Sequence, residues 1–169
     1  MKRARAVTLV ELVLVIVLTL ILASVAIGGL KGVQTWRAAA AIRRIHADLT
    51  YTRNLAMISS RRTLCTFDSS ADSYEIRQEA VPSQGQITGS LVQHPLTGQS
   101  WSVLLADLGG AVAIDTVTGV SDESLGFGGD GMPLDALGQP VTGDVTVGLS
   151  NAAEIVVYRG SGLSEVVWP

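Results

Sequence analysis

The chain has 169 residues, a length that is enough for one modest domain with an accessory segment. Its net charge is −3. Its single cysteine, Cys65, excludes an internal disulfide. The charge is unevenly spread: residues 31–62 hold seven basic residues and one acid, whereas residues 63–169 hold two basic residues and thirteen acids, which sums to −11. This asymmetry indicates that the two parts of the chain face different surroundings.

The first predicted element is an apolar helix over Val7–Leu30, which is 24 residues long. A helix of that length spans about 36 Å, more than the hydrocarbon core of a bilayer at about 30 Å. Lys2, Arg3 and Arg5 precede it, and basic flanking residues favour a cytoplasmic amino terminus. The sequence therefore predicts a single transmembrane helix over residues 7–30, with the rest of the chain outside the cytoplasm.

Glu11 is the one charged residue in this apolar run. A carboxylate in lipid costs several kcal/mol unless it is compensated. One explanation is that it reaches the headgroups from the end of the helix. Another is that the run is an ordinary secretory signal, with Ser24-Val25-Ala26 as its cleavage site. Against the second, the run is longer than the usual 7–15 residues, and it contains Glu11.

A third explanation rests on a resemblance. The stretch Ala6-Val7-Thr8-Leu9-Val10-Glu11-Leu12 resembles the class III signal of type IV pilins and type II secretion pseudopilins. The resemblance implies that a prepilin peptidase removes a leader of residues 1–6 by cutting between Ala6 and Val7, and that Val7 is then N-methylated. Glu11 becomes the fifth mature residue and pairs with the Val7 amine of a neighbouring subunit, which sets the register of assembly.

The match departs from the family pattern in two places. The family prefers Gly before the cut and Phe after it, where this chain has Ala6 and Val7. Many members have Pro near mature position 22, where this chain has Gly28, followed by Gly29. Glycine weakens a helix by roughly 1 kcal/mol per residue, so either choice produces a weak point there.

The second predicted element continues the helix over residues 31–62. Apolar or small residues recur along it at spacings of four and three, which is one face of an amphipathic helix: Ala38, Ile42, Ile45, Leu49, Thr52 and Ala56. Six arginines spread around the same segment: Arg37, Arg43, Arg44, Arg53, Arg61 and Arg62. They suggest either a nucleic-acid patch or a solvated face, and we expect the solvated face.

After Arg62 the pattern changes to short alternating runs, which predict about seven strands and hairpins: 64–67, 74–77, 101–105, 112–114, 145–149, 155–158 and 163–168. Residues 81–99 are rich in Gln, Gly, Ser and Pro and predict a long loop. The fold class is therefore α+β: a long amino-terminal helix packed on a small β-rich head, residues 63–169, of two antiparallel sheets.

The head resembles the minor pseudopilin H and FimT group. That group follows its helix with hairpins, a Gly-rich loop containing Phe, and a final hairpin with a small-residue turn. Here these parts are Leu125–Pro133 and the turn at Ser161-Gly162. The resemblance implies a minor subunit that contacts other pilin or pseudopilin subunits.

No enzyme chemistry is predicted. Gly126–Gly131 fits G-x-G-x-x-G, but Met132-Pro133 follows without a helical period, so we expect a turn and no bound cofactor. The acids Asp122, Glu123, Asp130 and Asp135 offer oxygens to a cation but lack the spacing of a calcium loop. His46 and His94 have no third ligand near them in the sequence, so no zinc site is expected.

These observations predict a structural subunit of a type II secretion pseudopilus or type IV pilus. We expect it in the inner membrane, with its carboxyl-terminal head in the periplasm. Two alternatives stay open. A DNA-binding minor pilin needs basic residues on the head, because phosphate neutralisation supplies most of the affinity; a head near −11 argues against that role, and we do not expect nucleic acid as a partner. The other is a membrane-anchored or secreted periplasmic protein that never polymerises.

Overall fold

The computed structural model describes residues 9–81, 85–110, 112–150 and 153–168, and the side chains of these residues except 25–34. The chain divides into two compact units, residues 1–36 and residues 37–169. We call them the amino-terminal unit and the head unit. One helix, α1 (Leu9–Ser59), contributes its first part to the amino-terminal unit and its second part to the head unit.

Within the head unit, α1 buries the face that the sequence predicts. All six residues at the predicted spacing of four and three are buried. Thr52 is polar, and the other five join the main core: Ala38, Ile42, Ile45, Leu49 and Ala56. Ser60 follows the helix in the left-handed conformation with φ 52°, which ends it. Arg61 and Arg62 therefore lie in the connection to the first strand.

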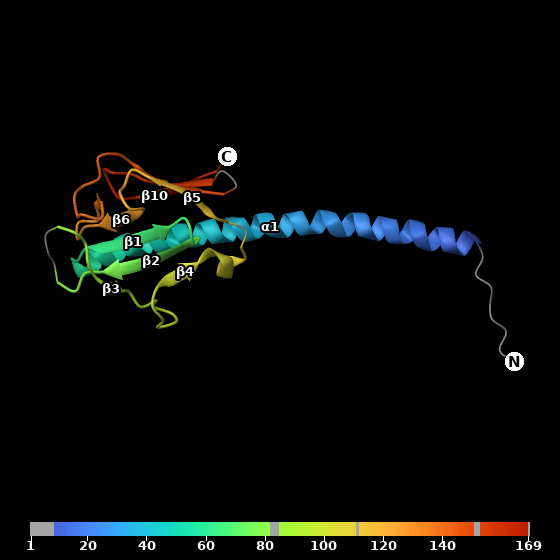
Figure 1. Ribbon diagram of the computed structural model, residues 1–169, viewed down its shortest axis with the longest axis horizontal. Coiled ribbons are helices and arrows are strands. Elements are labelled where there is room, and N and C mark those ends of the chain that lie inside the picture. Colours follow the sequence, from blue (N-terminus) through green and yellow to red (C-terminus); the bar gives the residue numbers. More distant parts are fainter. Residues whose placement is uncertain (1–8, 82–84, 111, 151–152, 169) are drawn as a thin grey trace. The chain divides into compact units, whose positions relative to one another are not determined.

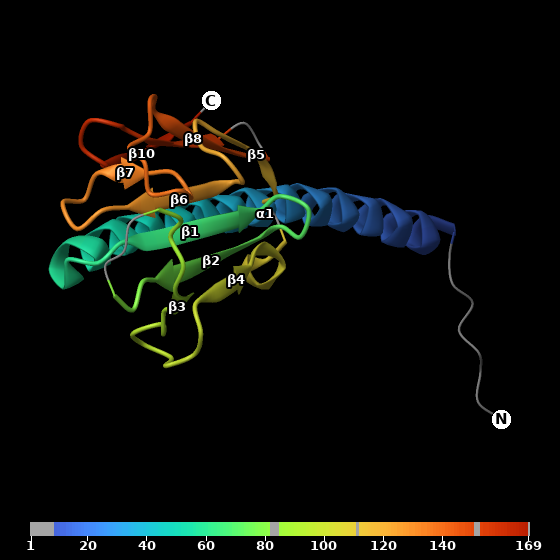
Figure 2. The ribbon, with the colours of Figure 1, turned by 60° about the vertical axis from the view of Figure 1, so that its left-hand side comes forward.

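The first sheet has six strands and is antiparallel throughout: β1 (Thr63–Asp68), β2 (Ser73–Gln78), β3 (Ser90–Leu91), β4 (Ser102–Leu104), β6 (Ser124–Phe127) and β7 (Pro133–Leu134). Its order is β3-β2-β1-β6-β7, and β4 pairs with β2 next to β3. β1 and β2 form the predicted hairpin and lie along the head part of α1 (Figures 1 and 2). Cys65, Phe67 and Tyr74 join the same core as Ile45 of α1.

The second sheet is a four-stranded antiparallel sheet of order β10-β9-β8-β5. Its strands are β5 (Ile114–Thr118), β8 (Val145–Leu149), β9 (Ala153–Val157) and β10 (Ser164–Val167). Alternate residues of β8 and β9 are at most 2% exposed and complete the core, whereas the residues between them face away from it. A short 3₁₀ helix, η1 (Leu105–Leu108), connects β4 toward β5.

The fold class is confirmed as α+β with two antiparallel sheets. Several details differ from the expected strands. β3 lies within residues 81–99, which the sequence predicts as a loop, because Ser90 and Leu91 pair with the end of β2. β5 runs over Ile114–Thr118, whereas the expected strand covers 112–114. The strand expected over residues 101–105 ends at Leu104, because the chain turns into η1 there. The sequence also predicts no strand over residues 124–127 or 133–134, yet β6 and β7 extend the first sheet from β1. The glycines of this segment read as a turn, but Gly126 faces Leu64 of β1 as a buried strand residue.

Candidate assembly helix and the polar centre of the head unit

The amino-terminal part of α1 exposes apolar side chains on all sides. Between residues 9 and 22, twelve large apolar side chains are between 48% and 80% exposed: Leu9, Val10, Leu12, Val13, Leu14, Val15, Ile16, Val17, Leu18, Leu20, Ile21 and Leu22. A helix that is hydrophobic all round is normally buried among other elements or in lipid. This segment is therefore a surface that a partner or a lipid phase must cover. Among the described residues, no helix has both the length and the apolar character needed to cross a bilayer.

The two hydroxyl groups in this segment are satisfied by the helix itself. The Thr19 hydroxyl lies 2.8 Å from the carbonyl of Ile16 and 3.0 Å from that of Val15, and the Ser24 hydroxyl donates to Ile21 at 2.7 Å. Such bonds let a hydroxyl face an apolar environment without losing a hydrogen bond. Glu11, in the first turn of α1, is exposed and is the one charged side chain between residues 9 and 24. Ala6 and Val7, the predicted cleavage and methylation residues, lie outside the described residues.

A buried carboxylate, Asp48, forms the polar centre of the head unit. It is 5% exposed and accepts hydrogen bonds from three directions. The Tyr74 hydroxyl donates to Oδ2 at 2.7 Å, and the Trp101 indole N–H donates to the same oxygen at 3.2 Å. The Arg44 guanidinium, one turn earlier on α1, lies 3.0 Å from Oδ1. A buried charge needs such compensation, so Asp48 joins α1 to β2 and to the start of β4.

Arg44 extends this network to the connection between β3 and β4. Its Nη2 lies 2.7 Å from Nε2 of His94. Because a guanidinium only donates hydrogen bonds, the His94 nitrogen is the acceptor. The His94 ring packs against Trp101 in a tilted arrangement with 4.5 Å between ring centroids, and Trp101 packs against Tyr51 of α1 in the same way at 4.8 Å. The predicted loop over 81–99 is thus fixed to α1 near its end by His94.

Burial changes the acid–base behaviour of two groups beside Asp48. Burial raises the pKa of the Tyr74 hydroxyl, and the Asp48 charge adds to that effect. Burial likewise raises the pKa of the Cys65 thiol, with smaller contributions from Asp48 and Glu75. A thiol kept protonated in the core is a poor nucleophile. Cys65 therefore serves as a small core residue.

Of the six arginines in residues 31–62, three make hydrogen bonds or ion pairs within the head unit. Arg44 pairs with Asp48, and Arg62 forms a two-pronged pair with the buried Glu79, with Nε 2.8 Å from Oε2. Arg53 joins the turn after β6 to the turn between β9 and β10, since it donates to the carbonyls of Gly131 at 3.2 Å and Ser161 at 2.9 Å. The expectation of a solvated face is therefore wrong for these three arginines. Arg37, Arg43 and Arg61 are exposed.

The acidic loops use their carboxylates in turns. Asp130 accepts the backbone N–H of Met132 at 3.0 Å, and Asp135 accepts that of Gln139 at 2.8 Å. Glu123 binds the hydroxyl and backbone N–H of Ser69. Within the described parts of the chain, no three side chains of the metal-ligating kinds group together. The Gly126–Gly131 segment contains the end of β6 and the turn after it, and among the described residues no helix follows, so the segment lacks the strand-to-helix context of a dinucleotide site.

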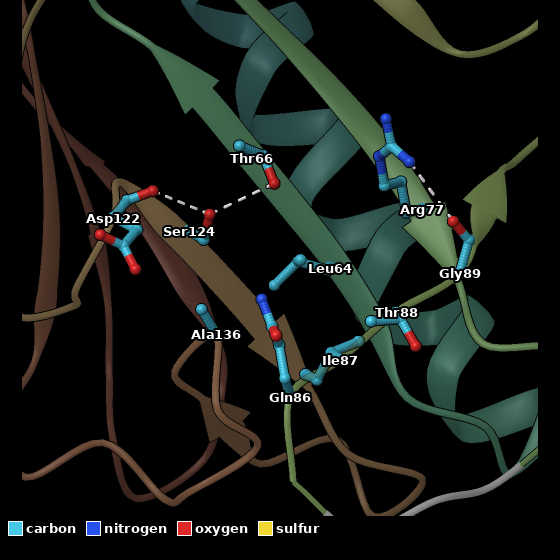
Figure 3. A pocket seen from close by; sticks show the side chains of 10 residues that line it. All are labelled: Leu64, Thr66, Arg77, Gln86, Ile87, Thr88, Gly89, Asp122, Ser124 and Ala136. Carbon is cyan, nitrogen blue, oxygen red and sulfur yellow. Dashed lines mark hydrogen bonds between the residues drawn. The ribbon is translucent and has the colours of Figure 1, made fainter.

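A shallow hollow lies on the outer face of the first sheet (Figure 3). It encloses about 310 Å³, and Leu64, Ile87 and Ala136 form its apolar part. Its polar groups largely bond to one another: the Ser124 hydroxyl lies 3.2 Å from the Thr66 hydroxyl and 2.9 Å from the carbonyl of Asp122. This arrangement stabilises the β1–β6 pair and favours no particular ligand.

The polar centre is hard to predict from the sequence, because its members are far apart along the chain. Tyr74 and Trp101 lie 26 and 53 residues after Asp48. Two signals were available. Asp48 is the one acid among seven basic residues, and it follows Arg44 at the helical spacing of four.

Comparison of the chain with protein-family models, with curated proteins and with solved structures finds no match.

Proposed function

We propose that this protein is a structural subunit of a membrane-anchored filament, a pseudopilus of type II secretion or a type IV pilus. The observation that carries the proposal is the amino-terminal part of α1, where large apolar side chains are exposed on every side and both hydroxyls are satisfied internally. Such a helix needs lipid before assembly and neighbouring helices afterwards. The continuation of α1 into the core of the head unit supports a subunit in which anchor and head share one element.

Glu11 supplies the register in this proposal. Cleavage between Ala6 and Val7 creates a new α-amine four residues before Glu11. In a staggered bundle, the Glu11 carboxylate of one subunit pairs with the Val7 amine of the next. A buried ion pair adds little stability, but a misplaced one is costly, so it selects one stagger among many.

The charge distribution favours this function over DNA binding. Arg44, Arg53 and Arg62 are committed to contacts within the head unit, and residues 63–169 hold thirteen acids against two basic residues. Phosphate contacts need accessible basic groups. The proposal therefore takes other subunits, a prepilin peptidase and the inner membrane as partners, with the head unit in the periplasm.

The test is mass spectrometry of the amino terminus of the protein isolated from membranes. The proposal predicts that the mature chain begins at a methylated Val7. Co-expression with a catalytically inactive prepilin peptidase should leave residues 1–6 in place. A mature chain that begins at Ile27 would instead identify an ordinary secretory signal, and an intact Met1 beside an active peptidase would also contradict the proposal.

A further inference from the structure

The head part of α1 has an open face of small residues and arginine. Exposed residues follow one another at spacings of three and four between residues 40 and 50: Ala40, Arg43, Ala47 and Thr50. Asp48, the one acid of α1 within the head unit, is buried on the other side. Within the described residues, Arg43 makes no ion pair. We call these four residues the basic face of α1.

The outer face of the second sheet has the opposite character. Glu154, Val156, Glu165 and Val167 point away from the core, and we call these four residues the acidic face. The strand register places Glu165 opposite Val156, and Val167 opposite Glu154. Glu154 and Glu165 are thus diagonal neighbours across β9 and β10, a relation in which residues lie roughly 7–8 Å apart and their Cβ atoms somewhat closer. The four strands of this sheet contain no basic residue.

We propose that the basic face of α1 in one subunit docks on the acidic face of a second copy of this chain, with Arg43 between Glu154 and Glu165. The separation of the two carboxylates suits one guanidinium, whose planar fork presents donors in two directions. Ala40 and Ala47 on either side of Arg43 let the helix approach the sheet closely, and Val156 and Val167 supply apolar contact. This inference rests on the proposed filament function and names the contact between its head units.

The contact joins two different surfaces of the same chain. Head-to-tail contacts of this kind form rings or open helical filaments, whereas a contact between identical patches stops at a dimer. Complementary charge also sets the partner: two basic faces repel each other, and so do two acidic faces. The polarity of the contact therefore agrees with growth in one direction.

The test is site-directed cross-linking of the full chain in phospholipid vesicles with a short bismaleimide. The variants are Ala47→Cys and Val156→Cys, and the buried Cys65 remains as the native background. Each single variant alone should stay monomeric, a mixture of the two should give dimers, and the double variant should give a ladder. Self-cross-linking of either single variant to the same extent as the mixture would overturn the head-to-tail contact.

Charge reversal tests the assigned pairs in the same cysteine backgrounds. Arg43→Glu in the Ala47→Cys chain should lower the dimer yield about tenfold. Glu154→Arg with Glu165→Arg in the Val156→Cys partner should restore it. Arg61→Glu and Asp107→Lys change exposed charges outside the two faces and should leave the yield unchanged. Equal losses in these controls, or no rescue by the reversed partner, would contradict the pairing.

An independent reporter separates this inference from the proposed function. Ile16→Cys lies on the exposed apolar part of α1 and should cross-link to itself when the anchors assemble. If Ile16→Cys cross-links while the mixture of head variants does not, the docking contact is wrong and the filament function stands. If Ile16→Cys also fails, the filament function itself is wrong. Protection of Ala47→Cys by anionic vesicles, without cross-linking, would identify lipid as the occupant and overturn the contact.

Discussion

At the scale of single residues, Asp48 has the largest effect on the head unit because so many donors converge on it. Tyr74, Trp101 and Arg44 each aim a polar hydrogen at its carboxylate. These donors come from β2, from the residue before β4 and from α1. Removing the acceptor leaves the buried Tyr74 hydroxyl and the buried Trp101 N–H without this partner, and that cost exceeds the modest net gain of forming the bonds.

Asp48→Ala should therefore destabilise the head unit by about 3 kcal/mol. The measurement is urea unfolding of the detergent-solubilised chain, followed by near-ultraviolet circular dichroism. Asp107→Ala removes an exposed acid from η1 and should leave the midpoint nearly unchanged. Similar midpoints for Asp48→Ala and the wild-type protein would show that the convergence on Asp48 adds no stability.

Tyr74 gives the head unit a sensitivity to alkali. Its pKa is raised in the folded state by burial and by the Asp48 charge, whereas an unfolded tyrosine titrates near 10. Above about pH 10 the unfolded chain loses this proton and the folded chain keeps it, so stability falls as pH rises. The slope contributed by one such group is about 1.4 kcal/mol per pH unit.

Unfolding free energies between pH 8 and pH 11 would show this slope in a Cys65→Ala background, which removes the other buried acid of raised pKa. Tyr74→Phe in that background should flatten the profile, because phenylalanine has no proton to lose. Tyr158→Phe removes a surface hydroxyl whose pKa is also raised, by its hydrogen bond to Glu165, so it serves as the comparison and should reduce the slope less than Tyr74→Phe does. Parallel profiles for Tyr74→Phe and its parent would contradict the assignment to Tyr74.

At the scale of elements, the two turns joined by Arg53 show why glycine recurs there. Gly162 has φ +66°, and a Cβ at that position would lie 2.1 Å from the carbonyl oxygen of Gly131. In the turn between β9 and β10, the backbone at Gly162 therefore packs directly against the backbone of the turn after β6, with no room for a side chain. Arg53 donates to a carbonyl in each turn and so holds both against α1.

Gly162→Ala should accordingly cost about 2 kcal/mol or more, because it combines a strained backbone with a steric clash. Gly160→Ala, two residues earlier, meets no atom within 4 Å and should change stability by less than about 0.5 kcal/mol. Thermal melting of the two variants under identical conditions makes the comparison. Equal melting temperatures would show that the two turns can separate without cost.

Elements with a strong hydrophobic period can be predicted from the sequence. Elements whose residues locally favour another structure cannot. The buried face of α1 was predicted residue by residue, since spacings of three and four leave one solution for a helix. The β1–β2 and β9–β10 hairpins were predicted from alternation around short polar turns. β6 was missed because Gly126 and the glycines after it favour a turn locally, and its pairing with β1 is a contact between distant parts of the chain.

At the scale of the whole molecule, the proposed assembly depends on two kinds of surface, one apolar and one charged. The amino-terminal part of α1 offers apolar side chains and one carboxylate, and the head unit offers a basic face and an acidic face. The hydrophobic effect is not directional, so apolar contact through the first surface does not select one relative position of neighbouring helices. In the proposed assembly, Glu11 and, in the head unit, Arg43 add the electrostatic matches that select one stagger and one polarity.

The most direct test of the account is incorporation of Glu11→Ala into filaments in cells that express the wild-type assembly machinery. The account predicts an unchanged amount of the variant in the membrane, because the apolar helix is intact, and its loss from purified filaments, because the Val7 amine of the neighbour has no counter-charge. Leu12→Ala, a truncation beside Glu11, should still be incorporated. Filaments that contain Glu11→Ala at the wild-type level would contradict the pairing of Glu11 with the amino terminus of the next subunit.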